Sequence, residues 1–219
     1  MIKIRKRFKL YMGLLLCTLS LNAQNPFIEN KGQLPKQVKV KVNLPSGSLF
    51  IEQGKLIYAF YSGEQLAAVH DLSAPSKNID AHAYIVEFVN SSPNTSTALS
   101  EESKYYENYF LGDQSKWATS VKSYKSLYQK NVYNGIDLQY YVDKDKLKYD
   151  IIIAPNANIK QIKIQYEGVE KTKLQGGDLF VTTSVNTVKE HQPYAYQIIN
   201  GNQVEVHCIY VLKKDMLSF

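Results

Sequence analysis

Three short runs in which apolar and polar residues alternate fill the segment from Asn131 to Gly168. A period of two is the spacing of a β-strand, because successive side chains of a strand point to opposite faces of the sheet. Turn residues separate the runs at Asn134-Gly135, Asp143-Lys144-Asp145 and Pro155-Asn156. The apolar faces are Ile136, Leu138, Tyr140 and Val142, then Leu147, Tyr149, Ile151 and Ile153, then Ile162, Ile164 and Tyr166. The segment therefore predicts antiparallel strands joined by tight hairpins, each strand burying one face.

The same period recurs along the rest of the chain, for example at Val38, Val40 and Val42. The seventeen tyrosines suit half-buried pleated surfaces. No stretch predicts a long amphipathic helix, although segments 64–72 and 100–108 have room for a turn or two. The chain is therefore predicted to be all-β, an antiparallel β-sandwich-like module of about ten to twelve short strands.

A polar stretch, Asn90 to Ser100 (NSSPNTSTALS), interrupts this pattern. Ser, Thr, Asn and Pro in such a cluster are typical of a loop. The residues before it, 25–89, are few for an independent β domain. We therefore expect one domain with a long surface loop over residues 90–103.

The start of the chain has the pattern of an export signal. Basic residues at Lys3, Arg5, Lys6, Arg7 and Lys9 precede the apolar run Leu10 to Leu21, and Ala23 offers a small residue for cleavage. A transmembrane helix needs about 20 apolar residues, so this shorter run fits a cleaved signal better than an uncleaved anchor. Residues 1–23 are predicted to be a signal peptide and 24–219 the mature module, placed on the outer cell surface or in the medium, with the periplasm as the alternative. Lipidation at Cys17 is not expected, because leucine precedes it where a small residue is required.

Removal of the signal changes the charge balance. Five of the 26 basic residues precede Ala23 and none of the 20 acidic residues does, which leaves 26 − 5 = 21 basic against 20 acidic residues. Nucleic-acid binding based on the net charge of +6 therefore loses its support. Both arginines are also in the signal, so the mature chain has no bidentate fork for phosphate.

The acidic residues offer little chemistry. Asp143 and Asp145 lack the D-x-D-x-D-G spacing of a calcium loop and are predicted to be turn residues. Asp137 and Asp150 take outward positions on adjacent strands. A hydrolase, the less favoured alternative, would need a pocket uniting one of them with another carboxylate or a histidine.

The remaining reactive residue types show no catalytic or ligand spacing. His70, His82, His191 and His207 form no metal motif, and the chain has no G-x-S-x-G elbow. His82 is expected to be a satisfied, partly buried residue, and Glu190 and His191 to lie at the rim. Cys208, the one cysteine after residue 23, is expected to be a buried structural thiol within the strand-like VEVHCIYVL. No catalytic residue, metal or cofactor is predicted.

Aromatic residues are the better functional hint. Tyr105, Tyr109 and Trp117 lie close in sequence, together with Tyr106 and Phe110, among polar residues. Tyrosine and tryptophan suit interfaces because each has an apolar body and a polar tip. Tyr105, Tyr109 and Trp117 are the candidate ligand-binding residues, either for stacking on a glycan or for docking a neighbouring domain. Ordinary sheet packing is the alternative, and an exposed coplanar pair among the three would favour the glycan.

Several short motifs occur in the order known from one family. They are Phe27-Ile28-Glu29-Asn30-Lys31-Gly32-Gln33, Tyr109-Phe110-Leu111-Gly112-Asp113 with Trp117, Val132-Tyr133-Asn134-Gly135-Ile136-Asp137-Leu138, Leu147-Lys148-Tyr149-Asp150 and Pro193-Tyr194-Ala195-Tyr196-Gln197. Taken as an ordered set they resemble the N-terminal domain of unknown function that precedes SBBP-type β-propeller repeats. That domain is found in large secreted bacterial proteins, many from Bacteroidetes and some associated with gliding motility or type IX secretion. Two turn-compatible departures occur: Asn134 stands where the family has proline, and Asn156 where it has glycine.

The resemblance implies a non-catalytic structural or interaction module of a cell-surface or secreted protein. Its implied partner is the set of propeller repeats that follows in relatives, and the chain reaches Phe219 about where the module itself ends, so we expect a fragment without these repeats. A glycan or a surface protein is the further expected partner, and no nucleic acid is expected. A carbohydrate-binding module using exposed aromatics is the alternative function.

Overall fold

The fold is that of a computed structural model, which describes residues 10–15 (backbone only), 26–68, 78–143 and 146–219. These ranges contain eighteen strands, one six-residue helix α1 (Gly63–Ala68) and the 3-10 helices η1 (Gln114–Lys116) and η2 (Ile159–Gln161). The all-β prediction is confirmed. The strands outnumber the roughly ten to twelve expected, in part because three of them span only three residues, too few to display a period of two.

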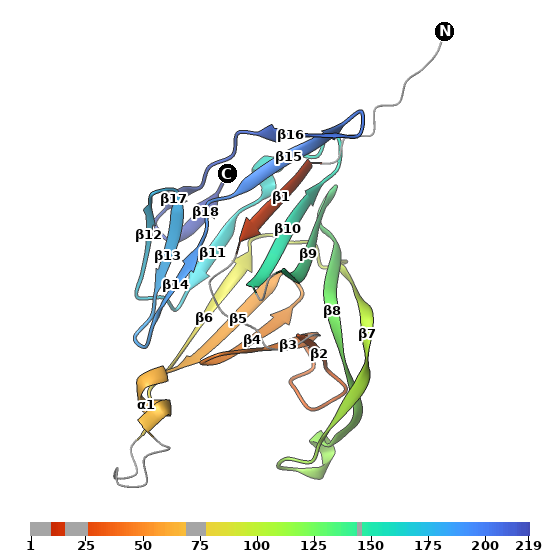
Figure 1. The fold of residues 1–219 in the computed structure, drawn as a ribbon, viewed down its shortest axis with the longest axis vertical. Coiled ribbons are helices and arrows are strands. Elements are labelled where there is room, and N and C mark those ends of the chain that lie inside the picture. The colour runs from red at the N-terminus through yellow and green to blue at the C-terminus, as the bar shows by residue number, and fades with distance from the viewer. Residues whose placement is uncertain (1–9, 16–25, 69–77, 144–145) are drawn as a thin grey trace.

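The strands form one large and one small antiparallel sheet (Figure 1). The large sheet has the order β16-β15-β1-β10-β9-β8-β2-β3-β4-β5-β6-β11-β18-β17, with β7 paired to β8, and the small sheet has the order β12-β13-β14. The first ten strands are β1 (Leu10–Leu15), β2 (Phe27–Glu29), β3 (Val40–Leu44), β4 (Gly47–Glu52), β5 (Lys55–Tyr61), β6 (Ala81–Phe88), β7 (Ser96–Tyr109), β8 (Ala118–Tyr133), β9 (Ile136–Asp143) and β10 (Lys146–Ile153). The last eight are β11 (Ile164–Glu167), β12 (Lys171–Gln175), β13 (Asp178–Thr182), β14 (Thr187–Glu190), β15 (Tyr194–Ile199), β16 (Asn202–Val206), β17 (Val211–Lys213) and β18 (Met216–Ser218).

The large sheet folds back on itself around one core. Phe88 on β6 meets Tyr149 on β10 edge to face, with 6.3 Å between the ring centroids, although six strands separate β6 from β10 in the sheet order. The small sheet adds Leu179, Val181 and Val188 to the same core. Two faces of sheet packed on a common interior make the predicted sandwich-like arrangement.

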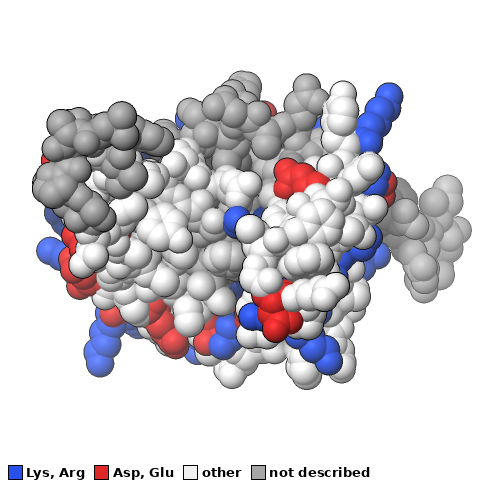
Figure 2. Space-filling model, turned by 90° about the horizontal axis from the view of Figure 1, so that it is seen from below, with Lys and Arg blue, Asp and Glu red and all other residues white. Residues whose placement is uncertain are grey.

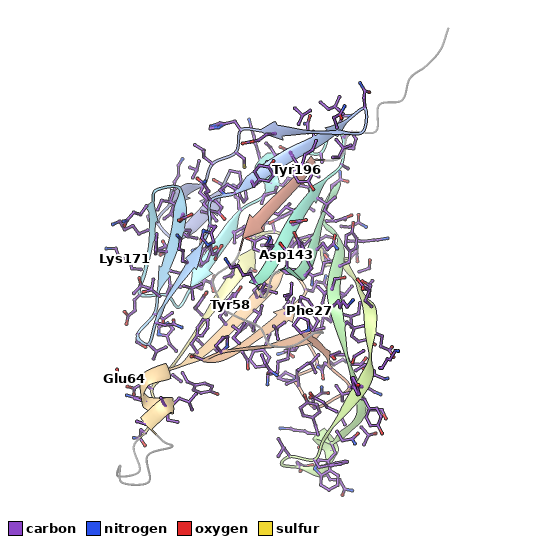
Figure 3. The ribbon with its side chains drawn as sticks, in the orientation of Figure 1. Phe27, Tyr58, Glu64, Asp143, Lys171 and Tyr196 are labelled. Carbon is purple, nitrogen blue, oxygen red and sulfur yellow. The ribbon has the colours of Figure 1, made fainter. Side chains whose placement is uncertain are left out.

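The predicted alternation decides which side chains are inside. Along β9 and β10 every second residue is buried, from Ile136 to Tyr140 and from Leu147 to Ile153. Figure 3 places Phe27 and Tyr58 in the interior and Glu64 and Lys171 at the periphery, in accordance with their exposure. Burial of each such large apolar side chain stabilises the fold by about 1.5–3 kcal/mol.

The predicted hairpin turns form at the expected residues. Asn200 and Gly201 both have positive φ, +53° and +83°, as a two-residue turn of type I′ requires. Gly135 has φ +72° between Tyr133 and Ile136, which are register partners. The β9–β10 hairpin is confirmed by the pairing of Asp143 with Lys146, while its turn residues 144–145 lie outside the described ranges.

The predicted loop over residues 90–103 is wrong after residue 95. Strand β7 begins at Ser96 and pairs with β8 along most of its length, which also rules out the helical turn expected at 100–108. The error has a physical cause: β7 is held by backbone pairing to β8 while nearly all its residues are half-exposed or exposed. A strand without a fully buried face carries little apolar alternation to reveal it.

The predicted signal peptide, residues 1–23, lies outside the described ranges except for Leu10–Leu15. The backbone of these six residues forms β1, which lies between β10 and β15 and pairs antiparallel with both (Figure 1). The prediction of cleavage after Ala23 remains a prediction.

The surface charges are mixed. On the face in Figure 2, lysines and carboxylates lie close together around the margin, with uncharged residues between them. Lys55 pairs with Glu87 and Lys125 with Glu101, the second pair on two exposed side chains. This distribution agrees with the near balance of charge after residue 23 and offers no single-signed track on this face.

Candidate interaction sites

The predicted aromatic residues lie at the far end of the β7–β8 hairpin, which projects from the body of the molecule (Figure 1). We call residues 105–117 the hairpin tip. Tyr105, Leu111 and Trp117 expose 83, 78 and 44 % of their surface, and Tyr106 and Phe110 are also exposed. Large apolar groups gathered on a projection are unusual in a surface that only meets water, and they mark interaction sites.

Tyr109 differs from its neighbours because it is half-buried. It packs against a small cluster of Ile28, Ala118 and Val121 at the base of the tip. Its hydroxyl donates a hydrogen bond to Glu107, and burial together with this carboxylate raises the pKa of Tyr109 well above its usual value. Tyr109 therefore anchors the hairpin tip, while Tyr105 and Trp117 are the predicted residues that remain open to a partner.

Two of the exposed rings at the tip, those of Phe110 and Trp117, are not coplanar. Phe110 and Trp117 meet at an interplanar angle of 71°, with 5.2 Å between the ring centroids. The turn between them is shaped by η1, whose N-cap Asp113 accepts a hydrogen bond from the backbone N–H of Ser115 at 2.8 Å. An edge-to-face pair fits an irregular protein surface better than the flat face of a sugar ring.

Two irregularities set the direction of the tip. The pairing of β7 with β8 shifts register between Glu102 and Tyr106 and again between Glu107 and Tyr109. Glu101 and Ser120 take positive φ near these shifts, at +59° and +55°. Such bulges increase the local twist and re-aim side chains.

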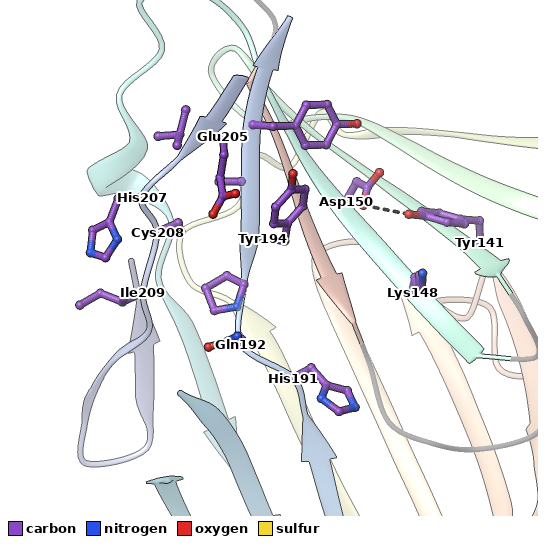
Figure 4. Close-up of a pocket in the computed structure, with 14 residues that line it drawn as sticks. Tyr141, Lys148, Asp150, His191, Gln192, Tyr194, Glu205, His207, Cys208 and Ile209 are labelled. Atoms are coloured by element: carbon purple, nitrogen blue, oxygen red, sulfur yellow. Dashed lines mark hydrogen bonds between the residues drawn. The ribbon is translucent and has the colours of Figure 1, made fainter. Parts of the chain in front are cut away.

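A cavity of about 620 Å³ lies at the opposite end of the large sheet (Figure 4). Tyr141 from β9, Lys148 and Asp150 from β10 line one side of it, and Tyr194 and Tyr196 from β15 line another. The remaining lining residues are His191, Gln192, Pro193, Ala195, Glu205, Val206, His207, Cys208 and Ile209. No sequence pattern predicted the cavity, because its walls come from β9, β10, β15, β16 and the segments before β15 and after β16.

Asp150 is a half-buried carboxylate of this cavity. The hydroxyl of Tyr141 donates to its Oδ1 at 3.1 Å, as drawn in Figure 4, and burial raises the pKa of Asp150. His191 lies 3.7 Å from Asp178 and Lys148 pairs with Asp143, so both have carboxylate partners other than Asp150. The cavity thus brings Asp150 together with a second carboxylate, Glu205, and with His191 and His207, which is the grouping that the hydrolase alternative requires. Within the described residues the hydrogen-bond partner of Asp150 is Tyr141 and not one of these three.

Asp137, the other candidate carboxylate, has a structural role. Its two oxygens accept hydrogen bonds from the Tyr128 hydroxyl and from the backbone N–H of Asn131, both at 2.7 Å. It takes the predicted outward position next to β10, opposite Ile152, but it is not among the residues that line the cavity. Asp137 therefore fixes the β8–β9 turn.

His82 fits its prediction. Its Nδ1 accepts from the Ser184 backbone N–H at 3.2 Å, so its Nε2–H donates to the Gly168 carbonyl at 2.6 Å. Cys208 is half-buried rather than buried, and it follows the end of β16 instead of continuing that strand, so the expected single strand from 204 to 212 is wrong. Burial raises the pKa of the Cys208 thiol, which disfavours the reactive thiolate.

Glu190 was expected at the rim and is instead one of the most buried polar residues, 2 % exposed. The Tyr166 hydroxyl donates to its Oε1 at 2.9 Å, and its Oε2 has no hydrogen-bond partner among the described residues. The alternation of side chains along a strand is the signal that sequence reasoning missed. Glu190 lies two residues after the buried Val188 on β14, so the two side chains share one face of the sheet.

Within the described ranges, no three His, Cys, Asp or Glu side chains are grouped closely enough to hold a metal ion. None of the helices in those ranges has the length and apolar character needed to cross a membrane.

Residues 27–219 match a protein family, DUF7948, described as a domain of unknown function. The chain belongs to the DUF7948 family. The matched residues take in every element from β2 to β18 and leave out β1. No curated protein and no solved structure matches the chain in these comparisons. The predicted membership in a family of unknown function is confirmed, whereas the propeller repeats and the export route stay predictions.

Proposed function

We propose that this DUF7948 chain is an exported, non-catalytic interaction module that acts on the outer cell surface or in the medium. In this proposal the hairpin tip is its binding surface, and the partner is the surface of another protein domain. The β-propeller repeats expected downstream are the first candidate partner. The single observation that carries the proposal is the exposure of Tyr105, Leu111 and Trp117 at the end of a projecting hairpin.

The arrangement suits protein binding for a physical reason. A handful of aromatic and apolar anchors, surrounded by polar residues, supplies most of the free energy of many protein interfaces. At the tip, the charged residues Asp113 and Lys116 lie between the anchors Leu111 and Trp117 in the chain, and the Lys122 Nζ lies over the Tyr106 ring at 5.9 Å from its centroid. The hairpin holds these groups away from the body, so a partner reaches them without rearranging the core.

The test is a titration of the full chain against a polypeptide that carries propeller repeats of the expected type. The variant Tyr105→Ser/Leu111→Ser removes two exposed anchors, and Tyr61→Ser/Ile159→Ser removes two exposed apolar side chains elsewhere. Loss of one interface anchor raises Kd about tenfold or more. We expect that loss in the tip variant and none in the control; equal binding by both variants rejects the tip as the surface.

Glycan binding is the second candidate, and the exposure of the Tyr105 and Trp117 side chains favours it. Its test is thermal unfolding of the full chain with a panel of polysaccharides, in which a ligand at one hundred times its Kd stabilises the folded state by about 2.7 kcal/mol. A shift that is lost in Trp117→Ala replaces the protein partner with a glycan. An unchanged midpoint across the panel removes the glycan candidate.

A further inference from the structure

The position of β1 is unusual because six residues from the apolar run near the N-terminus lie inside the large sheet, as the third strand from one edge. The strand pairs with β10 from Leu10↔Ile153 to Leu15↔Lys148 and with β15 from Leu10↔Gln197 to Gly13↔Tyr194. In the described strand order, β1 is the element that joins the β15–β16 hairpin to β10 (Figure 1). The connection between β15 and β10 in the sheet therefore passes through β1.

The two strands that border β1 define what fits between them. Leu10, Met12 and Leu14 take the register positions opposite Ile153, Ile151 and Tyr149, all of which are buried. Gly13 takes the position opposite both Asp150 and Tyr194, which line the cavity of about 620 Å³. An extended segment with apolar residues at alternate positions satisfies this register, and the residue in the place of Gly13 takes the position opposite two cavity-lining residues.

An independent observation concerns the extent of the family. The DUF7948 match begins at Phe27, so the strand that completes the sheet comes from outside the residues that define the domain. Without β1, two strand edges would face each other across a gap of about 9.6 Å, twice the usual spacing between strands. The β15–β16 hairpin would then be a two-stranded unit, which is marginal in isolation, and its side chains along β16 are already largely exposed.

We propose that the gap between β10 and β15 is a strand-acceptor site, which takes an extended apolar segment of a partner polypeptide once residues 1–23 are removed. The backbone of the incoming segment pairs antiparallel with both borders, in the manner of strand addition to an open edge. Specificity comes from three alternate apolar positions over the core and one position over Asp150 and Tyr194. This inference rests on the export part of the proposed function, since export is what removes β1.

The test uses the full chain with a protease site placed between β1 and β2, so that the protein folds before it is cut. After cleavage and removal of the freed N-terminal fragment, hydrogen exchange is followed at residues 148–153 and 194–197. A labelled peptide of residues 8–16 is then added as the probe, and the same peptide with Met12→Pro is the matched control. Proline removes a backbone donor that a central strand needs.

We expect exchange at both segments to accelerate at least tenfold after removal of the fragment and to return to its starting rate with the probe but not with the proline peptide. Protection that persists without the fragment means that the borders have closed on each other and overturns the proposal. Equal effects of the two peptides overturn it as well. If the cut chain forms dimers in which residues 148–153 are protected, the occupant of the gap is a second copy of this chain. That result overturns the proposal of a different partner polypeptide.

The outcome is separable from that of the proposed function. N-terminal sequencing of the exported protein reports whether residues 1–23 are removed, and the tip variant reports the hairpin surface. A chain that keeps its N-terminus fails the export part, while the peptide exchange still reports the strand site.

Discussion

Glu190 makes the fold sensitive to pH in an unusual direction. Burial of this carboxyl, with one oxygen bonded to the Tyr166 hydroxyl and the other without a described partner, raises its pKa from 4.5 to about 7. The protonated form is therefore favoured in the folded state. Stability from this group is fully present below pH 4.5, falls as the pH rises, and is lost above pH 7. The difference between the two pKa values corresponds to about 3 kcal/mol.

The substitution Glu190→Gln tests this reasoning because it keeps the shape and the acceptor oxygen but carries no charge. At pH 5 the parent is mostly protonated in the folded state, and the two proteins should have similar free energies of unfolding. At pH 8 the parent must bury a carboxylate, and the variant should be more stable by up to about 3 kcal/mol. The difference between the two proteins cancels the other titrating groups, such as Asp150, that also change stability with pH.

The assay is urea unfolding followed by tyrosine and tryptophan fluorescence at pH 5, 6, 7 and 8. Glu167→Gln, at an exposed position on β11, is the matched control and should track the parent at every pH. A gap between Glu190→Gln and the parent that stays constant from pH 5 to pH 8 refutes the argument. A variant less stable than the parent at pH 8 refutes it too.

Three further substitutions follow from the described contacts. Asp137→Ala removes the acceptor for the Tyr128 hydroxyl and the Asn131 backbone N–H. It should lower the free energy of unfolding by about 2–3 kcal/mol in the same urea assay. A change under about 0.5 kcal/mol would contradict the structural role of Asp137. Gly135→Ala should lower the free energy of unfolding more than Gly176→Ala. Both glycines have positive φ, but an added Cβ at Gly135 comes within 2.9 Å of the Ala157 Cβ, whereas Gly176 has open space around it. Equal thermal midpoints for the two variants would contradict the clash at Gly135. Leu111→Ser should change stability by less than about 0.5 kcal/mol, whereas Leu138→Ala in the core should lower it by about 2–5 kcal/mol; a large loss in Leu111→Ser would mean that the tip packs on the body.

The sequence predicts those parts of the fold whose strands have one face in the core. The alternation from Ile136 to Ile153 and the turn at Asn200-Gly201 identify hairpins because burial of one face and positive φ each restrict the residue types allowed. Strand β7 could not be found in this way, since its pairing with β8 depends on backbone hydrogen bonds and leaves its side chains in water.

The hairpin tip and the cavity differ in how far the sequence predicts them. The grouping of Tyr105, Tyr109 and Trp117 follows from local sequence, because the three residues lie in one short segment. Their exposure does not, since sheet packing was the alternative and Tyr109 is half-buried. The cavity does not, because Asp150 and Tyr194 are brought together by strands that pair through β1. Glu190 was predicted at the rim because charged residues are rarely buried. The one sequence feature that indicated burial is its spacing of two residues from Val188 on the same strand.

The most direct test of the central claim is photo-crosslinking of the exported protein in its own cells. A photoreactive residue replaces Leu111 at the hairpin tip in one variant and Tyr61, on the body, in another. The account predicts a discrete adduct with one partner polypeptide from position 111 and none from position 61. No adduct from position 111, or the same adducts from both positions, would contradict a function of this DUF7948 chain through its hairpin tip.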